Sequence, residues 1–380
     1  MRILIAHSRY LQRGGEDQVV DAEAGLLRKH GDEVLMYEEH NDTIRGMSRP
    51  QLAIETIWSR RSADKFTKIA VEFKPDVLHV HNTFPLISPA IYWKASSLGI
   101  PVVQTLHNYR LICPQAMLLR DNRVCEECVS RSPWRSVRHA CYRNSRIQTG
   151  VIAAMIVTHQ LLHTFADKIS AYIALTGFSR DKFIEGGLPG NRIHVKPNFV
   201  DIEPTPRTVG TNGLFVGRLY EEKGIRTLGA VLEQLPSVQL DVIGAGPMNT
   251  VIEKLPNCTL LGWKTPGEVH AAMRGAAYLV VPSIWYETFG LIVIEAYACG
   301  LPVIASRIGA LAELVQEGGT GLLVEPGSTE DLADKIRWAE SHPEEMAAMG
   351  ERGREIYQDN YTSDQNYRML MAIYKEISAD

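Results

Sequence analysis

The chain has 380 residues, of which 45% are hydrophobic and 22% are charged, and its formal net charge is -4. These values are ordinary for a globular protein and exclude a disordered, collagenous or coiled-coil chain. At roughly 150 residues per domain, the length predicts about two domains. No apolar run approaches the roughly 18 residues of a membrane-spanning helix, and residues 1–7 are interpreted as a buried strand rather than a signal peptide.

The small net charge conceals a difference between the two halves. Residues 1–200 carry 26 Lys and Arg against 19 Asp and Glu, whereas residues 201–380 carry 14 against 25. Such an asymmetry is typical of two domains with different partners, although chance is the alternative.

Short β-branched runs alternate with longer helical patterns along the whole chain, and this alternation predicts parallel sheets covered by helices on both faces. We therefore expect an α/β fold of two Rossmann-like, doubly wound domains that face a cleft. The helices expected in the first half include Gln18–His30 and Ser62–Phe73. The predicted strands are Arg2–Ala6, Glu33–Tyr37, Val77–His81, Pro101–Leu106, Ala171–Leu175, Gly213–Val216, Gln239–Ile243, Cys258–Leu261, Tyr278–Val281, Pro302–Ala305 and Gly321–Val324.

The domain boundary is predicted near residue 197, because a polar stretch from Glu203 to Asn212 suits a linker. The domains would span residues 1–197 and 198–360. The remaining residues, 361–380, include a run from Asn360 to Ile377 with apolar side chains on one helical face. This helix either caps the second domain or crosses back to the first.

The stretch from Val281 to Ala296 carries the most informative motif. A strand ends there, and a helix begins near Phe289 and Gly290. The backbone amides at Gly290 and Leu291 would favour an anion such as a phosphate, because the start of a helix leaves N–H groups unpaired.

Two carboxylates accompany this helix start. Glu287 lies in the loop before it, and Glu295 lies in its second turn among apolar neighbours. A routine solvent-exposed position is disfavoured for Glu295. The two carboxylates could accept hydrogen bonds from hydroxyl groups on either side of a bound phosphate.

A second motif follows the strand that ends at Val216. Gly217 would let the backbone approach a ligand, and Arg218 and Lys223 lie on the loop that enters the next helix. Two permanent cations at the carboxyl end of a strand suit a diphosphate, whereas either residue alone is usually solvated.

Two glycine signals are weaker. Gly244 and Gly246 form a G-x-G after a strand, but Asn249 interrupts the full dinucleotide fingerprint, which disfavours an oxidoreductase. Gly262 follows the next strand and could form part of a base pocket. Tight turns are the alternative for all three glycines.

Together these motifs resemble those of the family 4 glycosyltransferases, which have the two-domain GT-B fold. The resemblance covers nearly the whole chain and rests on Glu287-x7-Glu295 with its internal Phe-Gly-Leu, and on Gly217-Arg218 followed by Lys223-Gly224. It implies that the second domain binds a nucleotide-sugar donor, that the first binds the acceptor, and that the terminal helix crosses back to the first domain.

The resemblance also implies residue roles. Arg218 and Lys223 would neutralise the donor diphosphate, Glu287 would hold sugar hydroxyls, and Glu295 would accept from the ribose hydroxyls. The predicted donor-binding residues are Gly15, Gly217, Arg218, Lys223, Gly262, Glu287, Phe289, Gly290, Leu291 and Glu295.

The first half fits the same resemblance. Gly15 opens a helix after the first strand, as the family's glycine loop does, and a helix-start turn is the alternative. His107 matches the family's histidine beside the donor sugar, against the alternative of a structural histidine. His79 and His81 share one face of a strand and either line the acceptor side or pack in the core.

The implied chemistry is metal-independent transfer of a sugar with retention of configuration. No Asp-x-Asp motif suits a donor-bound cation, so the cations and the helix start would carry the leaving-group charge. The predicted catalytic residues are His107, Arg218, Lys223 and Glu287. We expect a glycan or lipid-linked acceptor and a role in surface polysaccharide synthesis. The alternatives are a nucleotide-sugar epimerase and a non-enzymatic nucleotide-binding regulator.

Cysteines and basic residues cluster in one segment of the first half. Cys113, Cys125, Cys128 and Cys141 could hold a structural zinc ion, with packing thiols and disulfides as alternatives. Arginines follow Cys128, with Trp134 interleaved. They suit either an anionic membrane surface or a solvated face, and no nucleic-acid module accompanies them. We expect a cytoplasmic protein and leave open a peripheral position at the inner face of the membrane.

Overall fold

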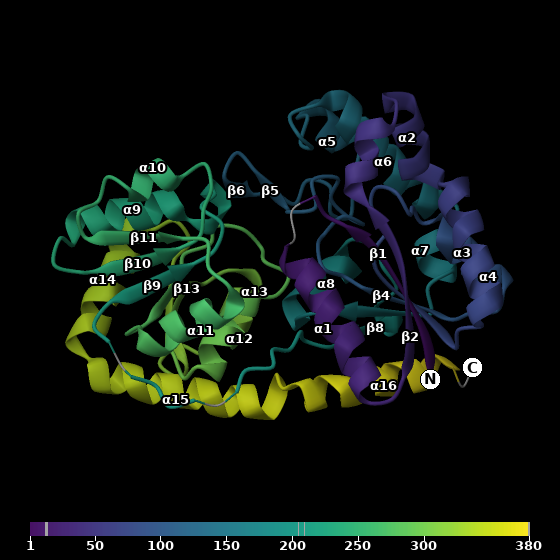
Figure 1. Cartoon of the computed structure of the whole chain (residues 1–380). Helices are drawn as coiled ribbons and strands as arrows, with labels where there is room; N and C mark the ends of the chain where they lie inside the picture. Colours follow the sequence, from purple (N-terminus) through teal and green to yellow (C-terminus); the bar gives the residue numbers. More distant parts are fainter. Residues whose placement is uncertain (12–13, 204, 209, 379–380) are drawn as a thin grey trace. The chain divides into compact units, whose positions relative to one another are not determined.

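The computed structural model describes residues 1–11, 14–203, 205–208 and 210–378. It divides the chain into two compact units (Figure 1). The first unit comprises residues 1–118 and 125–198 together with the C-terminal segment from residue 366, and the second comprises residues 119–124 and 199–365. Of the predicted terminal segment, residues 379 and 380 lie outside the described residues.

The first unit is built on a six-stranded parallel sheet with the order β2-β1-β3-β4-β7-β8. The central strands β1 and β3 are buried along almost their whole length, which is typical of a parallel sheet covered on both faces. The strands are β1 (Arg2–Arg9), β2 (Glu33–His40), β3 (Val77–Asn82), β4 (Val102–Thr105), β7 (Ala171–Ala174) and β8 (Ile193–Val195). The helices are α1 (Gly15–Lys29), α2 (Arg49–Trp58), α3 (Arg60–Phe73), α4 (Ala90–Ser97), α5 (Arg135–Arg138), α6 (Arg146–Leu161), α7 (Thr164–Asp167), α8 (Gly177–Glu185) and α16 (Ser363–Ser378).

Helices α1 and α16 pack on the same part of this sheet (Figure 1). Leu27 of α1 and Leu370 and Tyr374 of α16 share a buried cluster with Ile3 and Ile5 of β1. The last helix of the chain thus contributes to the core of the first unit, where it contacts the first strand and the first helix.

The second unit contains a six-stranded parallel sheet with the order β11-β10-β9-β12-β13-β14. In chain order this is 3-2-1-4-5-6, the Rossmann order, and it reverses direction between β9 and β12. The strands are β9 (Gly213–Val216), β10 (Leu240–Ile243), β11 (Cys258–Gly262), β12 (Leu279–Val281), β13 (Val303–Ser306) and β14 (Gly321–Val324). The helices are α9 (Ile225–Gln234), α10 (Asn249–Ile252), α11 (Pro266–Gly275), α12 (Leu291–Ala298), α13 (Gly309–Leu314), α14 (Thr329–Ser341) and α15 (Pro343–Asn360).

The structure confirms the two doubly wound α/β sheets and adds elements that the sequence did not predict. These are the short edge strand β8 and an antiparallel hairpin of β5 (Leu119–Arg120) and β6 (Arg123–Val124). Among the helices that the structure describes, none has the length and apolar character needed to cross a bilayer.

Candidate active site

The loops that follow β9 and β12 meet at the carboxyl edge of the second sheet. β12 pairs with β9, and the Ile284 N–H donates to the Glu222 carbonyl at 3.0 Å. Gly224 adopts a φ of +74°, and a Cβ there would stand 1.9 Å from the Pro282 carbonyl oxygen. Only glycine fits this contact. The two loops are therefore locked together where the strand order reverses, which is the usual ligand position in such sheets.

Lys223 and Glu287 form an ion pair across these two loops. Lys223 Nζ lies 2.8 Å from Glu287 Oε1, and the Ser283 hydroxyl donates to the same carboxylate oxygen at 2.7 Å. Lys223 Nζ also stands 5.6 Å from the centre of the Trp285 ring. Because the side chains of Lys223 and Glu287 remain 20% and 12% exposed, a ligand can reach both.

Arg218 lies on the same loop as Lys223 but is held less firmly. Its guanidinium is 3.5 Å from the Glu222 carboxylate and stands over the Tyr220 ring at 5.1 Å. The side chain is 64% exposed. Its positive charge is therefore accessible to an anion at the same edge of the sheet.

Helix α12 starts at the loop that carries Glu287. Gly290 is its N-cap, with a φ of +154° that favours glycine, and Leu291 is its first residue. The Phe289 side chain is buried and makes an edge contact with Tyr361. The Phe289 side chain therefore fixes the loop by packing. Only the backbone of Phe289 is placed to contribute to a ligand site at the helix start.

Glu295 projects from α12 and is half-buried. Burial raises the pKa of its carboxyl to about 7. Within the described part of the chain, its carboxylate has no hydrogen-bond or ion-pair partner. A half-buried carboxylate can still accept hydrogen bonds from a ligand, so Glu295 suits one that brings hydroxyl donors.

The glycines after β9, β10 and β11 pack against one another. A Cβ on Gly244 would stand 1.9 Å from the Gly217 carbonyl oxygen, and one on Gly246 would stand 2.4 Å from the Leu219 carbonyl oxygen. The Gly244 N–H donates to the Gly262 carbonyl at 2.8 Å. The G-x-G pair is thus needed for close packing of these loops, as the tight-turn interpretation predicts.

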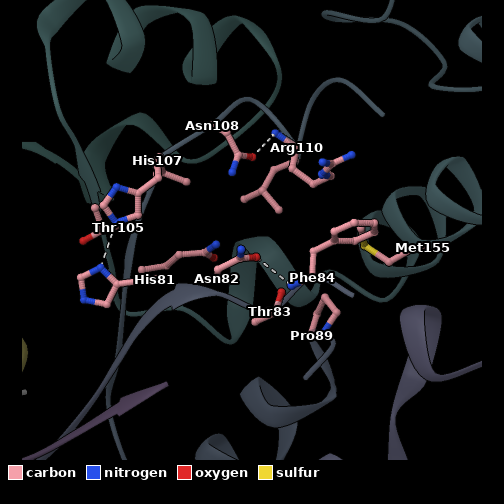
Figure 2. Close-up of a pocket in the computed structure, with 13 residues that line it drawn as sticks. His81, Asn82, Thr83, Phe84, Pro89, Thr105, His107, Asn108, Arg110 and Met155 are labelled. Atoms are coloured by element: carbon pink, nitrogen blue, oxygen red, sulfur yellow. Dashed lines mark hydrogen bonds between the residues drawn. The ribbon is translucent and has the colours of Figure 1, made fainter. Parts of the chain in front are cut away.

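In the first unit, His107 lies in the loop after β4 and lines a small cavity of about 30 Å³ (Figure 2). His107 is partly exposed, and its Nε2 is 2.9 Å from His81 Nδ1. Burial, and then the neighbouring His81, hold the pKa of His107 well below its usual value. The lining residues are His81, Asn82, Thr83, Phe84, Pro89, Gln104, Thr105, Leu106, His107, Asn108, Arg110, Leu111 and Met155.

Gly15 is the first residue of α1, in the loop that leads from β1. The next residue, Glu16, accepts from the Tyr10 hydroxyl at 2.9 Å and from Asn108 Nδ2 at 3.4 Å. Burial raises the pKa of Glu16 to about 7. This carboxyl joins the loop after β1 to the loop that carries His107.

The sequence analysis did not identify Arg110, which lines the same cavity as His107. Its guanidinium stands 4.3 Å from the Phe84 ring centre and 5.2 Å from that of Tyr142. Burial lowers the pKa of Arg110. The sequence did offer one signal for Arg110: it lies three residues after His107, in the same loop after a strand.

Comparison with known families finds a matching family model for each half of the chain. Residues 212–356 match the model described as glycosyl transferases group 1. Residues 13–204 match the model described as glycosyltransferase family 4, which covers half of the chain. The chain belongs to glycosyltransferase family 4. The family predicted from the donor-site motifs is thereby confirmed.

Curated relatives of this family 4 chain are named as glycosyltransferases, and two of the names differ in the sugar or acceptor that they give. A sulfoquinovosyl transferase of Arabidopsis thaliana is 26% identical over 87% of this chain and 64% of its own length. A D-inositol 3-phosphate glycosyltransferase of Segniliparus rotundus is 26% identical over 72% of this chain and 61% of its own length. An uncharacterized glycosyltransferase of Methanocaldococcus jannaschii is 34% identical over 44% of this chain and 48% of its own length. The chain thus spans about half to two thirds of the length of these relatives.

Solved structures share the fold of this family 4 chain along its whole length. Sucrose-phosphate synthase from Thermosynechococcus elongatus superposes with a TM-score of 0.72 and 19% identity, covering 100% of this chain and 99% of the other. HepE of Anabaena, solved in complex with UDP-glucose, superposes with a TM-score of 0.68 and 18% identity, covering all of both chains. At these identities the likeness establishes the GT-B fold.

Proposed function

We propose that this glycosyltransferase moves a sugar from a nucleoside-diphosphate sugar to a glycan or lipid-linked acceptor, with retention of anomeric configuration and without a catalytic metal. The observation that carries the proposal is the Lys223–Glu287 pair, which lies where the strand order of the second sheet reverses. Ligands bind at this point in doubly wound sheets.

In the proposed donor site, different charged residues of the second unit bind different parts of the nucleotide sugar. Lys223 and Arg218 meet the diphosphate, together with the first amides of α12, because cations and a helix start both stabilise anions. Glu295 accepts from the ribose hydroxyls. Glu287 accepts from hydroxyls of the sugar. Named relatives solved with UDP or UDP-glucose support a donor of this class.

The chemical step would rest on positioning and charge stabilisation. The bond between the anomeric carbon and the diphosphate oxygen breaks while the acceptor oxygen bonds to the same face of that carbon. The acceptor proton passes to a donor phosphate oxygen. Lys223, Arg218 and the α12 amides would stabilise the charge that develops on the leaving diphosphate, and His107 would contact the transferring sugar.

The first unit presents a surface that suits an anionic membrane or a lipid-linked acceptor. Trp134, beside α5, and Ile147, in α6, are 48% and 81% exposed, and α5 packs on α6. Within the described residues none of the neighbouring arginines is in an ion pair. Exposed cations beside apolar side chains suit anionic headgroups. We call this surface the α5–α6 patch; its arginines are Arg131, Arg135, Arg138, Arg143 and Arg146.

The same segment supports a structural zinc ion as part of the proposal. Burial, and then the thiols of Cys113, Cys141 and Cys125, raise the pKa of Cys128 to about 12, which places the four cysteines in one neighbourhood. None of the four forms a disulfide in the part of the chain that the structure describes. No three of their sulfurs lie within 4.8 Å of one another in the described residues, so zinc would draw them together. Zinc would staple a segment with little regular structure.

A thermal-unfolding screen of nucleotide sugars tests the donor proposal, since a ligand that binds only the folded state raises its stability. We expect one nucleotide sugar to raise the unfolding midpoint of the wild type but not of Lys223→Ala. A nucleotide that stabilises the protein without any turnover would favour the regulator, and conversion of the donor without an acceptor would favour the epimerase.

A further inference from the structure

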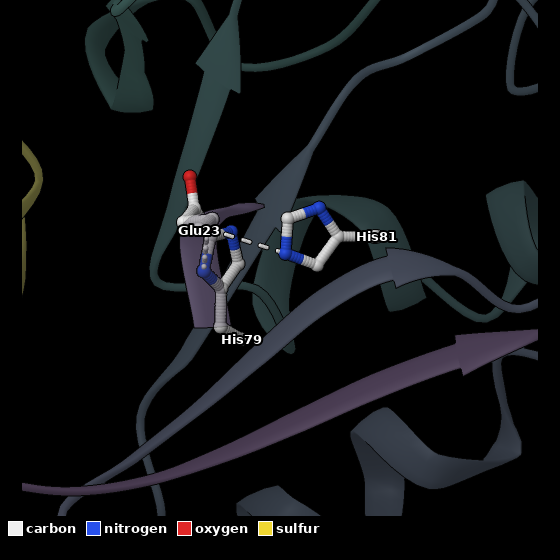
Figure 3. A group of neighbouring side chains, drawn as sticks. All are labelled: Glu23, His79 and His81. Carbon is white, nitrogen blue, oxygen red and sulfur yellow. Dashed lines mark ion pairs between the residues drawn. The ribbon is translucent and has the colours of Figure 1, made fainter. Parts of the chain in front are cut away.

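Four polar side chains of the first unit form a continuous line that ends at His107, which we call the Lys196–His107 chain. Lys196 Nζ is 3.1 Å from Glu23 Oε2, Glu23 Oε1 is 3.3 Å from His81 Nε2 (Figure 3), and His81 Nδ1 is 2.9 Å from His107 Nε2 (Figure 2). Lys196, Glu23 and His81 are each at most 3% exposed. The proposed donor contacts use none of these three.

Glu23 starts the argument because it is an ionised carboxylate inside the core. Although burial opposes ionisation, Lys196 and His79 hold the pKa of Glu23 well below its usual value. Lys196 also donates to Asn366 Oδ1 at 3.0 Å. An ionised carboxylate has only acceptor atoms. Each group that faces Glu23 must therefore present a proton to it.

His81 is the next residue in the line, and its proton must face Glu23. Burial lowers the pKa of His81 to about 3, so near neutral pH its ring carries a single proton. His81 Nε2 lies 3.3 Å from Glu23 Oε1, and neither buried atom has a well-aligned hydrogen-bond partner among the described residues, so the charge of the carboxylate decides which ring nitrogen is protonated. The proton therefore belongs on Nε2, where it faces Glu23. His81 Nδ1 is then an acceptor.

The acceptor on His81 fixes the proton of His107 in turn. His107 Nε2 must donate to His81 Nδ1 across their 2.9 Å contact. Since the low pKa of His107 keeps this ring neutral as well, its other nitrogen carries no proton. Nδ1 is thus the acceptor nitrogen of a residue that lines the cavity.

We propose that Glu23 and His81 are positioning residues that hold His107 as the neutral Nε2–H tautomer, so that its Nδ1 accepts a hydrogen bond from a hydroxyl of the transferring sugar. The assignment to a sugar rests on the proposed function. An unprotonated Nδ1 cannot bind a phosphate oxygen, because both atoms are hydrogen-bond acceptors. In this arrangement His107 does not stabilise the leaving diphosphate.

A metal centre is the main structural alternative, since ligand atoms of Glu23, His79 and His81 lie within 4.8 Å of one another. The charge of Glu23 is already balanced by Lys196. His79 is also engaged: its Nδ1 lies 2.6 Å from the Tyr374 hydroxyl and 3.0 Å from Glu23 Oε1, and its Nε2 lies 2.8 Å from Thr105 Oγ1. The group is therefore better explained as a hydrogen-bond network.

Glu23→Gln gives the sharpest test, because it should change which ring nitrogen carries the proton in both His81 and His107. The Lys196 ammonium can only donate, so the amide oxygen of the new side chain faces Lys196 and its NH₂ group faces His81. His81 must then accept at Nε2 and carry its proton on Nδ1. That proton is donated to His107 Nε2, which leaves the His107 proton on Nδ1.

The ring tautomers can be read directly by nitrogen NMR of the full chain labelled with ¹⁵N-histidine and without any ligand. Signals of His107 are assigned by their loss in His107→Gln. We expect the wild type to show a protonated Nε2 and an unprotonated Nδ1, and Glu23→Gln to show the reverse. A wild-type His107 protonated on Nδ1 overturns the proposal, and so does an unchanged tautomer in folded Glu23→Gln.

A second pair of variants keeps the test decisive if Glu23→Gln does not fold. His81→Asn places an amide oxygen close to the position of Nδ1 and should preserve the His107 tautomer, whereas His81→Leu should abolish the preference. Loss of the tautomer in both variants, or in neither, contradicts the relay. These measurements need no substrate, so their outcome is separate from that of the proposed function.

Kinetics test the role toward the sugar. With the donor found in the thermal screen, His107→Ala should lower kcat/KM at least tenfold but change inhibition by the bare nucleoside diphosphate less than twofold. Equal losses for the donor and the diphosphate would show that His107 meets the phosphate, which contradicts the proposal. If no donor is turned over while the tautomers reverse as expected, the proposed function fails and the relay stands.

Discussion

Lys223 and Glu287 are 64 positions apart in the chain, yet the lysine ammonium lies 2.8 Å from the glutamate carboxylate. The contact joins the loop after β9 to the loop after β12. It places a cation and a hydrogen-bond acceptor at the point where the strand order of the second sheet reverses. The pair is accessible, and a bound diphosphate sugar would separate its charges, with phosphate on Lys223 and hydroxyls on Glu287.

Replacing Lys223 by alanine should lower kcat/KM for the donor by about 100-fold. The change removes a cation from the proposed diphosphate site and leaves the charge of Glu287 unbalanced, so that the carboxylate repels the phosphate. Steady-state kinetics with saturating acceptor measure this. Lys254→Ala, on an exposed lysine of the same unit, is the matched control, and near-normal kinetics in Lys223→Ala would refute the donor site.

Replacing Glu295 by alanine should raise KM for the donor by about tenfold and change kcat less. The carboxylate is proposed to bind the ribose, which is remote from the reacting carbon, and such binding is equal in ground and transition states. The comparison is with Glu253→Ala, which alters an exposed glutamate. An unchanged KM would remove Glu295 from the site.

His81 and His107 should lower the stability of the fold as the pH drops from about 6.5, whereas Glu16 and Glu295, whose pKa values are raised to about 7, should act in the opposite sense between pH 7 and 4.5. The pKa of His81 is lowered to about 3 and that of His107 is also lowered in the folded protein, so between these values and the ordinary histidine value the unfolded state binds more protons. Each histidine then costs up to about 1.4 kcal/mol of unfolding free energy per pH unit. Glu23, with its lowered pKa, adds to the loss at more acidic pH.

Urea unfolding at several pH values between 7 and 4.5 measures this slope. His81→Asn should lose less stability than the wild type as the pH falls over this range, because the substituted side chain does not titrate. His163→Asn, on an exposed histidine in a left-handed turn that asparagine tolerates, should leave the slope unchanged. The same slope in His81→Asn as in the wild type would contradict the burial of a neutral histidine.

The purified chain should contain about one zinc ion, which Cys125→Ser should lose. Four thiolates complete a tetrahedral shell, and removal of one leaves a weaker site. Elemental analysis of protein kept reduced throughout measures the content. Cys258→Ser, which lies outside the segment, should retain the metal. Reduced wild-type protein without zinc would favour the packing-thiol interpretation instead.

The α5–α6 patch should bind vesicles that contain anionic lipid and should release them as the salt concentration rises, because screening weakens the attraction of exposed charges. Replacing Arg131, Arg135 and Arg138 by alanine should reduce binding in a flotation assay at least fivefold. A control with equal charge loss in the second unit replaces Lys254, Arg226 and Arg337. Equal reductions in both variants would mean that binding follows net charge alone.

The fold and the family could be predicted because their signals are local. Strands such as Gly213–Val216 and Gly321–Val324 are short apolar runs, and the structure has them at the predicted bounds. The edge strand β8 was missed because only three residues pair, on one side, and its central residue is His194.

The Lys196–His107 chain could not be predicted, since its members come from separate elements. Glu23 lies on α1, His81 on β3, and Lys196 directly after β8. The sequence analysis placed His79 and His81 on one face but had no means to pair them with a carboxylate far along the chain. Only tertiary packing brings a buried lysine and a buried glutamate together, and isolated charges in the sequence are usually solvated.

The most direct test of the central claim is acceptor-dependent transfer by the protein of residues 1–380. A nucleotide sugar is incubated with a lipid-linked glycan and no added divalent cation, and released nucleoside diphosphate and the anomeric configuration of the product are followed by NMR. We expect stoichiometric diphosphate and product with the donor's own configuration, and neither in Lys223→Ala. An inverted product, or diphosphate release that does not depend on the acceptor, would contradict the account.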